Sequence, residues 1–541
     1  MLKCLLLFVC MCGCTVKQQT FTGGAVAADH YLASKVGVEI LKKGGNAVDA
    51  AVATSFALSV VRPFSCGIGG GGFMLIDSPA MEPVALNYRE TAPHGVGPNF
   101  YQENSSRFGA TSVGIPGTVA GLLAAHERFG VLTREQVLMP ALHLASKGFK
   151  ADSAYVNAVR LANNALGSNP EFIALRINQS SVVVGQQLDM RNQHNALKLI
   201  MDYGADGFYQ GKLAQAIVSA TSGHISMQDL DTYTPRWETP LQIAIGSGNV
   251  LVCMPPPSSG GVAIAQMIGL LDRLNAKQYE GKPEFTQLLI EAMKHAFADR
   301  AEHMADATFV DVPVEQLLSA NYLDELASRI VLGKTQKSRE YGSHSPPPAD
   351  DGTSHICVID GNGMTVSVTE TINTSFGSMV TVEPFGFMLN NEMDDFSSPS
   401  GENAYGLRQS NKNLPEPNKR PLSSMSPTIV EQDGVPILVL GASGGPRIIS
   451  SVVQVLLAIL WFGDAPVEAL TRSRVHHQWL PDVVYVEDKY RDIALEKALR
   501  HFGYSIKART NIGVVQVIQS DTKYLKPASD PRKGGKPAGF N

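Results

Sequence analysis

The sequence predicts a mixed α+β protein in which helices dominate the first part of the chain and strands the second. Residues 47–60 are almost wholly apolar apart from Asp49, Thr54, Ser55 and Ser59, as in a buried helix. Residues 354–359 and 364–372 alternate and are rich in Val, Ile and Thr, and the turn DGNG at 360–363 joins them as a β-hairpin. A strand at 435–440 continues through a glycine-rich loop into an apolar helix at 448–461.

Further helices are expected at 116–129 and 284–304. Asp29 is expected to cap a helix that carries Leu32, Val36 and Ile40 on one side and ends at Gly44-Gly45. The clearest boundary is the stretch SHSPPPADDG at residues 343–352. Three prolines followed by two aspartates and a glycine favour an exposed, non-helical linker.

Composition indicates an ordinary globular protein. The 541 residues are 44% hydrophobic and 18% charged, with a net charge of -5. Without a dense Lys/Arg run, nucleic acid is not expected as a partner. Cys66, Cys253 and Cys357 are scattered, and the His residues form no HExxH or HxH pattern, so neither a disulfide framework nor a metal site is predicted.

The first residues are typical of an export signal, which we place at residues 1–20. Lys3 supplies a positive start, residues 5–12 are apolar, and small and polar residues follow. We therefore expect a periplasmic, extracellular or cell-surface protein. The Gly13-Cys14 step also resembles a lipoprotein cleavage site, so a lipid on Cys14 is one alternative, and an uncleaved apolar tail is another.

The hairpin carries the first chemical hypothesis. Counting residues from the turn places Thr353 opposite residues 370–372, near Thr371 and Asn373. Two hydroxyls and an amide would then converge beside the linker. The alternative is that Thr residues are frequent in strands for structural reasons.

Two other segments carry polar groups suited to binding. Residues 390–396 (NNEMDDF) could hold an amino group or a metal ion, or could be a solvated acidic loop. The loop GASGG at 441–445, between a strand and a helix, directs backbone N–H groups to one point and suits an oxyanion or a phosphate. A nucleotide P-loop is disfavoured because no Lys-Ser/Thr pair follows.

Taken together, these segments resemble the γ-glutamyltransferase family, in order and in spacing. The resemblance covers nearly everything after the export signal. The matching blocks in the first part are GIGGGGFM at 67–74, RETAP at 89–93, GIPG at 114–117 and PSSGG at 257–261. Those in the second part are TSH at 353–355, TIN at 371–373, NNEMDDF, KRPLSSM at 419–425, GG at 444–445 and ASDPR at 528–532.

The resemblance implies a four-layer αββα N-terminal-nucleophile hydrolase fold, one large domain built from two autocleaved subunits. Cleavage between Gly352 and Thr353 would give a helix-rich large subunit of residues 21–352 and a small subunit of residues 353–541, which stay associated as a heterodimer. The freed α-amine of Thr353, with a reference pKa of about 8, would act as the general base for its own hydroxyl. Thr371 would hydrogen-bond the nucleophile, and no cofactor is implied.

The resemblance also assigns a site for glutathione or other γ-glutamyl compounds. Arg89 would pair with the donor's α-carboxylate as a fork, with Ser423 and Ser424 as additional donors. Asp395, Glu392 and Asn373 would hold the α-ammonium. Many family members carry Gln where this chain has Glu392. The backbone N–H groups of Gly444 and Gly445 would form the oxyanion hole, and residues 397–418 would form a lid with Tyr405 as its gating aromatic residue.

Two alternatives remain at this stage. One is an acylase of the same fold that acts on β-lactam side chains, although an uncharged acyl group needs neither Arg89 nor Asp395. The other is a secreted binding protein without turnover. The sequence does not decide between transfer of the γ-glutamyl group to water and transfer to an acceptor amino acid or peptide.

Overall fold

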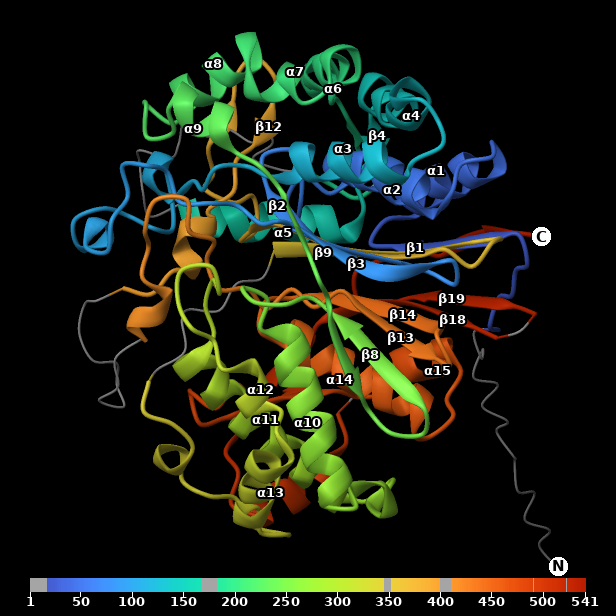
Figure 1. The fold of residues 1–541 in the computed structure, drawn as a ribbon, viewed down its shortest axis with the longest axis vertical. Coiled ribbons are helices and arrows are strands. Elements are labelled where there is room, and N and C mark those ends of the chain that lie inside the picture. Colours follow the sequence, from blue (N-terminus) through green and yellow to red (C-terminus); the bar gives the residue numbers. More distant parts are fainter. Residues whose placement is uncertain (1–16, 167–181, 345–351, 399–409, 490, 522) are drawn as a thin grey trace, which may run out of the picture.

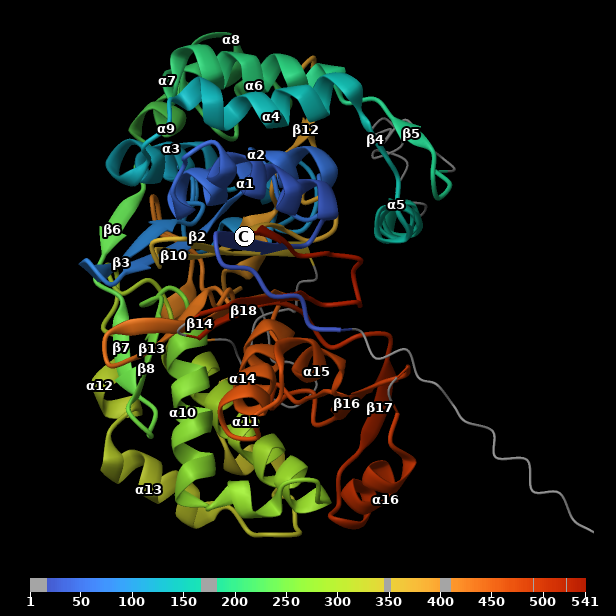
Figure 2. The same ribbon diagram turned by 90° about the vertical axis from the view of Figure 1, so that its right-hand side faces the viewer.

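Two β-sheets stacked face to face form the centre of the molecule, and helices cover the outer face of each (Figures 1 and 2). The structure is a computed structural model that describes residues 17–166, 182–344, 352–398, 410–489, 491–521 and 523–541. The four layers run helix, sheet, sheet, helix. The αββα class predicted from the sequence is therefore confirmed.

The first sheet has seven strands in the order β20-β1-β9-β10-β2-β3-β6. They are β20 (Ala538–Phe540), β1 (Gly24–Ala28), β9 (Gly352–Asp360), β10 (Thr365–Asn373), β2 (Gly71–Ser78), β3 (Met81–Tyr88) and β6 (Arg236–Glu238). All neighbours are antiparallel. β9 and β10 are the predicted hairpin, now seen to lie in the interior of the sheet.

The second sheet has six strands in the order β19-β18-β14-β13-β8-β7. They are β19 (Leu525–Ser529), β18 (Val514–Ser520), β14 (Val435–Ser443), β13 (Thr428–Gln432), β8 (Asn249–Cys253) and β7 (Leu241–Ala244). Both sheets thus combine strands from before residue 352 with strands from after it, so the two parts of the chain share one framework.

Helices of the first part of the chain cover the outer face of the first sheet (Figure 1). They are α1 (Tyr31–Lys42), α2 (Ala47–Val61), α3 (Thr118–Phe129), α4 (Arg134–Lys147), α6 (Arg191–Tyr203), α7 (Asp206–Tyr209), α8 (Gly211–Ala220) and α9 (Met227–Thr232). Helix α5 (Ser153–Leu166) lies to one side of the sheet (Figure 2). Every residue of α2 is buried. The apolar run that predicted this helix therefore reflects its position between the sheet and the outer helices.

The second sheet is covered by helices from both parts of the chain (Figure 2). They are α10 (Gly260–Arg273), α11 (Pro283–His303), α12 (Val314–Leu317), α13 (Ala320–Arg329), α14 (Arg447–Leu460), α15 (Pro466–Thr471) and α16 (Ile493–His501). Small pairings add β15 (Val475–His476), β16 (Val484–Glu487) and β17 (Ile506–Arg509) at one side, β4 (Phe149–Lys150) with β5 (Gln187–Leu188), and β11 (Thr381–Val382) with β12 (Phe387–Met388).

The apolar core is divided by the first sheet. One cluster fills the space between this sheet and α1 to α8, and the other joins the facing sides of the two sheets with α10, α11 and α14. Along β9, Ile356 and Val358 belong to the first cluster while Cys357 and Ile359 belong to the second. This alternation explains why the strand is buried over its full length.

The expected helices were found close to their predicted limits, but the predicted cap of the first was wrong. His30 caps α1, because its Nδ1 atom accepts a hydrogen bond from the backbone N–H of Leu32 at 3.1 Å. The side chain of Asp29 instead accepts hydrogen bonds from Lys533 at 2.7 Å and from Gln516 at 2.7 Å. This aspartate therefore ties the start of the chain to its last segment.

Several predictions fall outside the described residues. These are the export signal with Cys14, apart from residues 17–20, most of the linker at 343–352, and Tyr405 with half of the lid segment. None of the described helices combines the length and the apolar character needed to cross a membrane.

Glu370 is a carboxyl group buried beneath α2, on the face of β10 that points away from the second sheet. Its oxygens accept hydrogen bonds from the hydroxyls of Ser55 at 2.5 Å and Tyr88 at 3.0 Å. Burial raises the pKa of Glu370 from its ordinary 4.5 to about 7, although both hydrogen bonds act in the opposite direction. No cation is among the causes of its shift, so its ionised form is disfavoured in the folded protein.

We therefore expect Glu370 to make the stability of the protein pH-dependent. Because its pKa is higher in the folded state, its contribution is complete below pH 4.5 and is lost as the pH rises through about 7. Glu370→Gln removes this dependence and raises the free energy of unfolding at pH 8 by on the order of 2 kcal/mol. Urea denaturation at pH 5 and pH 8 measures it, and equal pH slopes for the two proteins would refute it.

Candidate active site

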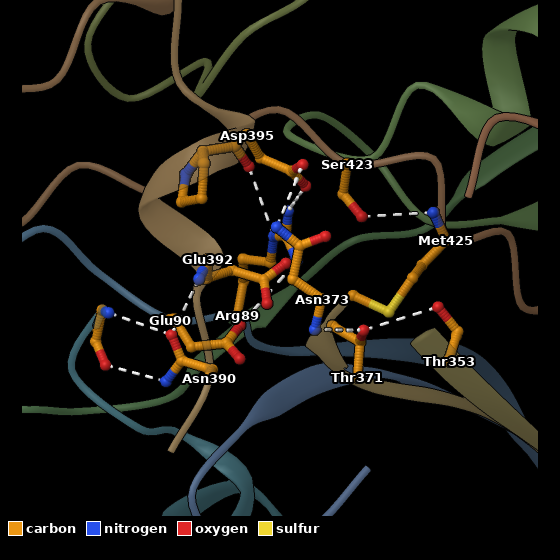
Figure 3. Close-up of polar contacts among 12 residues, drawn as sticks. Arg89, Glu90, Thr353, Thr371, Asn373, Asn390, Glu392, Asp395, Ser423 and Met425 are labelled. Atoms are coloured by element: carbon orange, nitrogen blue, oxygen red, sulfur yellow. Dashed lines mark hydrogen bonds and ion pairs between the residues drawn. The ribbon is translucent and has the colours of Figure 1, made fainter. Parts of the chain in front are cut away.

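Two threonines face each other at the ends of β9 and β10 (Figure 3). Thr353 pairs with Thr371 in the strand register, as residue counting predicted, and their Oγ1 atoms are 3.4 Å apart. The hydroxyl of Thr371 also donates a hydrogen bond to the carbonyl oxygen of Gly352. The hydroxyl of one threonine therefore lies beside the peptide bond that precedes the other.

The carbonyl group of Thr353 is held from the opposite side by the last segment of the chain. The Nζ atom of Lys533 donates to this oxygen at 2.6 Å and to the carboxylate of Asp29 at 2.7 Å. It also lies 3.5 Å from the hydroxyl of Ser443 at the end of β14. Sequence reasoning missed Lys533, although it directly follows the ASDPR block.

Asn373 links the threonine pair to the acidic segment. β10 becomes irregular between Thr371 and Asn373, where Asn373 has a φ of +71°. Its backbone N–H donates to the Thr371 hydroxyl at 2.8 Å. Its side-chain amide donates to the carbonyl of Asn391 at 3.0 Å and lies 3.5 Å from a carboxylate oxygen of Asp395. The irregular backbone thus directs the amide away from the strand and toward the carboxylates (Figure 3).

Arg89 forms the centre of a buried ion cluster. Its guanidinium binds Glu392 through Nη1 and Asp395 through Nη2, the second at 2.5 Å, and lies 3.8 Å from Glu90. Glu392 and Asp395 belong to the short 3-10 helix η6 (Glu392–Asp395). Burial lowers the pKa of Arg89, but the carboxylates of Glu392 and Asp395 outweigh it, so the net shift is upward. Arg89 is therefore firmly charged.

Burial raises the pKa of the Asp395 carboxyl, although Arg89 opposes the shift. Three carboxylates, of Glu90, Glu392 and Asp395, thus surround the guanidinium of Arg89, and the charge of Arg300 also acts on Asp395. The sequence analysis assigned Arg89 to the α-carboxylate of the donor, and Glu392 and Asp395 to its α-ammonium. The structure brings these residues together, but here they bind each other.

Ser423 and Ser424 lie next to this cluster. The Ser423 hydroxyl accepts a hydrogen bond from the backbone N–H of Met425 at 3.1 Å. The Ser424 hydroxyl accepts from the guanidinium of Arg300 at 2.9 Å, and Arg300 also binds Ser259 at 2.8 Å. Arg300, on α11, is a second residue that sequence reasoning missed, because nothing in the helical pattern distinguishes it from a surface charge.

Gly444 and Gly445 form the turn between β14 and α14. Their φ angles of +126° and +59° lie in the region that favours glycine. A Cβ atom on Gly444 would also lie 3.2 Å from the Cα atom of Gly513. The turn directly follows Ser443. The side chain of Lys533 contacts both the hydroxyl of Ser443 and the carbonyl oxygen of Thr353, and so connects the turn to Thr353.

The glycine-rich segment at 67–72 supports the strand that carries Thr371. A Cβ atom at Gly70 would collide with the carbonyl oxygen of Thr371, and one at Gly72 would lie 2.6 Å from the carbonyl oxygen of Thr369. Gly69 and Gly71 approach Met388 and Glu90 just as closely. These glycines therefore allow backbone and side chains to approach at distances that no Cβ atom permits.

The fold and the threonine pair define the class of the protein, which is that of the N-terminal-nucleophile hydrolases. The structure is similar to that of cephalosporin acylase from Bacillus halodurans, with a TM-score of 0.86 and 25% identity over 97% of both chains. A γ-glutamyltranspeptidase chain from Pseudomonas nitroreducens, complexed with L-DON, matches with a TM-score of 0.55 and 37% identity. That match covers 59% of this chain and 98% of the solved one.

The family follows from the sequence comparisons. The family model described as gamma-glutamyltranspeptidase matches residues 33–540. The chain is 40% identical to the glutathione hydrolase proenzyme of Pseudomonas aeruginosa, over 95% of this chain and 94% of that protein. It is 37% identical to the glutathione hydrolase proenzyme of Escherichia coli, over 94% and 90%. The chain belongs to the γ-glutamyltranspeptidase family.

The packing of the glycine-rich segment leads to a prediction about stability. Gly70→Ala forces the backbone of β10 away from β2 at Thr371, and we expect it to lower the free energy of unfolding by about 1–3 kcal/mol. Gly67→Ala is the matched control, because only the Cβ atom of Ser59, at 3.9 Å, lies within 4 Å of its added carbon. Urea denaturation of both variants provides the comparison, and equal stabilities would contradict the assignment.

Proposed function

We propose that this chain is a proenzyme that cleaves itself between Gly352 and Thr353 and then acts as a γ-glutamyltransferase and glutathione hydrolase. The large subunit comprises residues 21–352 and the small subunit residues 353–541. The observation that carries the proposal is the hydrogen bond from the Thr371 hydroxyl to the carbonyl oxygen of Gly352, beside the Thr353 hydroxyl. The names of the relatives, glutathione hydrolase proenzymes, support the same activity.

In the self-cleavage step, the Oγ1 atom of Thr353 attacks the carbonyl carbon of Gly352. The hydrogen bond from Thr371 stabilises the negative charge that develops on the carbonyl oxygen. The C–N bond breaks, the nitrogen takes the proton of the hydroxyl, and an ester joins the two residues. Water then hydrolyses the ester to leave a carboxylate on Gly352 and a free α-amine on Thr353. Lys533 holds the carbonyl of Thr353 and restricts its movement.

In turnover, the free amine of Thr353 takes the proton of its own hydroxyl, which attacks the γ-carbonyl of the donor. The backbone N–H groups of Gly444 and Gly445 stabilise the resulting oxyanion. The departing amine receives the proton, and a γ-glutamyl ester remains on Thr353. Water, or the amine of an acceptor amino acid or peptide, then attacks this ester and releases the product.

The ion cluster suits a donor that carries both an α-carboxylate and an α-ammonium. The donor's carboxylate replaces a protein carboxylate on the fork of Arg89, with Ser423 and Ser424 beside it. The ammonium takes the position of the guanidinium against Asp395, Glu392 and Asn373. Each buried charge exchanges one partner for another of the same sign, so binding leaves no ion of the site unpaired.

Strand pairing supports the association of the subunits after cleavage. β9 of the small subunit lies between β1 of the large subunit and β10 of its own. β13 of the small subunit likewise pairs with β8 of the large one. The share of this chain that the solved P. nitroreducens chain covers, 59%, is close to the share made up by residues 21–352. Separation would expose the edges of both sheets and both clusters of the core.

Residues 1–20 supply the remaining part of the proposal, as an export signal that directs the protein to the periplasm or the cell exterior. Lys3 and the apolar residues 5–12 support it. A lipid on Cys14 is the only membrane attachment that this segment offers.

The acylase alternative makes a different use of the site. The B. halodurans cephalosporin acylase has the same fold, and fold alone does not determine the acyl group. An uncharged acyl group would leave the charges of Arg89 and Asp395 without a role in binding. The binding-protein alternative leaves the contacts of Thr371 with Gly352 and Thr353 without a role.

Self-cleavage is tested by intact mass under denaturing conditions. We expect two wild-type fragments, the second beginning at Thr353, and one uncut chain for Thr353→Ala. Thr353→Ser is the control, because it retains a hydroxyl and should still cleave, although more slowly. Wild-type protein that remains uncut after prolonged incubation would refute the mechanism.

Donor recognition is tested with three p-nitroanilides. Compared with the γ-glutamyl compound, the glutaryl compound lacks the α-ammonium and the 4-aminobutyryl compound lacks the α-carboxylate. We expect kcat/KM for either analogue to be lower by at least about 100-fold, because each leaves buried charges of the site unpaired. Comparable kcat/KM values for all three compounds would favour the acylase alternative.

A further inference from the structure

Glu90 is a carboxyl group in the interior of the ion cluster, but no donor in the described part of the chain satisfies it. The side chain is completely buried, and neither oxygen has a hydrogen-bond partner among the described residues. Its nearest cation, Arg89, is 3.8 Å away. The guanidinium already donates to Glu392, Asp395 and two backbone carbonyls. A carboxylate buried without donors is strongly disfavoured.

The neighbouring group that can form a hydrogen bond with the carboxyl of Glu90 is the carboxyl of Glu392. Burial raises the pKa of Glu90 to about 7, although the charge of Arg89 opposes the shift in part. The two carboxyl groups meet at one atom, because Glu392 binds the Nη1 atom of Arg89 and Glu90 lies 3.8 Å from the same atom. Two carboxylates can only accept, so a hydrogen bond between them requires a proton. Because Glu392 is bound directly to Arg89, its negative charge is stabilised. The proton therefore belongs on Glu90, which donates it to Glu392.

We propose that Glu90 is a positioning residue of the donor site, which carries a proton and shares it with Glu392 through a carboxyl–carboxylate hydrogen bond. This inference rests on the proposed role of Glu392 as a partner of the donor's α-ammonium. The hydrogen bond orients Glu392 toward the position of that ammonium. It also reduces the charge of the cluster, because three carboxylates around one guanidinium give -2 and one proton makes it -1.

The other charged groups around Glu90 set the conditions of a test. Arg89 adjoins it in the chain, and Glu392 and Asp395 face it from η6. Tyr209 and Tyr233 face it from α7 and from the residue that follows α9. Burial raises the pKa of Tyr233 to about 12 and that of Tyr209 well above its ordinary value, so neither titrates below pH 9. Asp395 and the amine of Thr353 are unchanged in every variant of the experiment described below.

Loss of the shared proton is expected to weaken donor binding. Two facing carboxylates repel, Glu392 loses its orientation, and the additional negative charge opposes the donor's α-carboxylate. Glu90→Gln mimics the protonated form, because its amide N–H donates to Glu392 but does not titrate in this range. Glu392→Gln reverses the roles, since its amide donates to an ionised Glu90.

The experiment measures competitive inhibition by L-glutamate, with γ-glutamyl-p-nitroanilide as substrate, from pH 5.5 to 8.5 in the cleaved enzyme. We expect equal Ki values for wild type and Glu90→Gln at pH 5.5, within about twofold. At pH 8.5 we expect the wild-type Ki to be about tenfold higher than the Ki of Glu90→Gln. Glu392→Gln should flatten the profile in the same way. Glu370→Gln removes another buried carboxyl of raised pKa outside the cluster, and it should reproduce the wild-type profile.

Wild-type and Glu90→Gln profiles that superimpose would overturn the inference. So would a Glu90→Gln enzyme that binds L-glutamate more weakly than wild type at every pH, because Glu90 would then act as a carboxylate. If Glu90→Gln does not fold, a Glu392→Gln profile that keeps the wild-type pH dependence overturns it equally. Absence of inhibition of the wild-type enzyme at any pH would instead refute the donor site itself.

Discussion

The position of Thr353 depends on antiparallel pairing on both sides of β9. β10 pairs with β9 past Thr353 to Gly352, whereas pairing with β1 ends at Ala28 and Ile356. On that side, Lys533 binds the carbonyl of Thr353 in place of a strand. The threonine is therefore held by a strand on one side and by a side chain from the last segment of the chain on the other. A bond in this setting can be cut without loss of the position of the new terminus.

The same pairing explains why the two parts of the chain are interleaved. Each sheet has strands from both sides of residue 352, and each core cluster draws side chains from both. Cleavage removes one covalent bond but none of these contacts. The framework that aligns Thr353 with Thr371 is thus independent of the bond that the proposed reaction breaks, and the mature site inherits the geometry of the precursor.

Local sequence rules gave much of the fold but only part of the site. The hairpin turn and residue counting were enough to pair Thr353 with Thr371, because register in a tight hairpin follows from the turn. The four layers and the donor-site residues came from family resemblance, since no local pattern shows that Arg89 and Asp395, far apart in the chain, meet. Lys533 and Arg300 were missed because they bind a backbone carbonyl, serine hydroxyls and an aspartate far away in the chain, and no local pattern reports such contacts. Asp29 looked like a helix cap, but its ion pair with Lys533 depends on tertiary contacts that helix signals do not report.

The ion cluster connects stability to recognition. Buried ion pairs contribute little net stability when compared with apolar packing, but removal of one partner leaves an uncompensated charge. In the proposed function, Arg89 and its carboxylates bind one another until a zwitterionic donor replaces them. An acyl group with neither charge offers nothing to either side of the cluster, and a donor with only one leaves the other side unpaired. On this proposal, selectivity for the γ-glutamyl group follows from the need to keep the buried charges paired. The three carboxylates around the guanidinium of Arg89 are the reason why we infer a proton on Glu90.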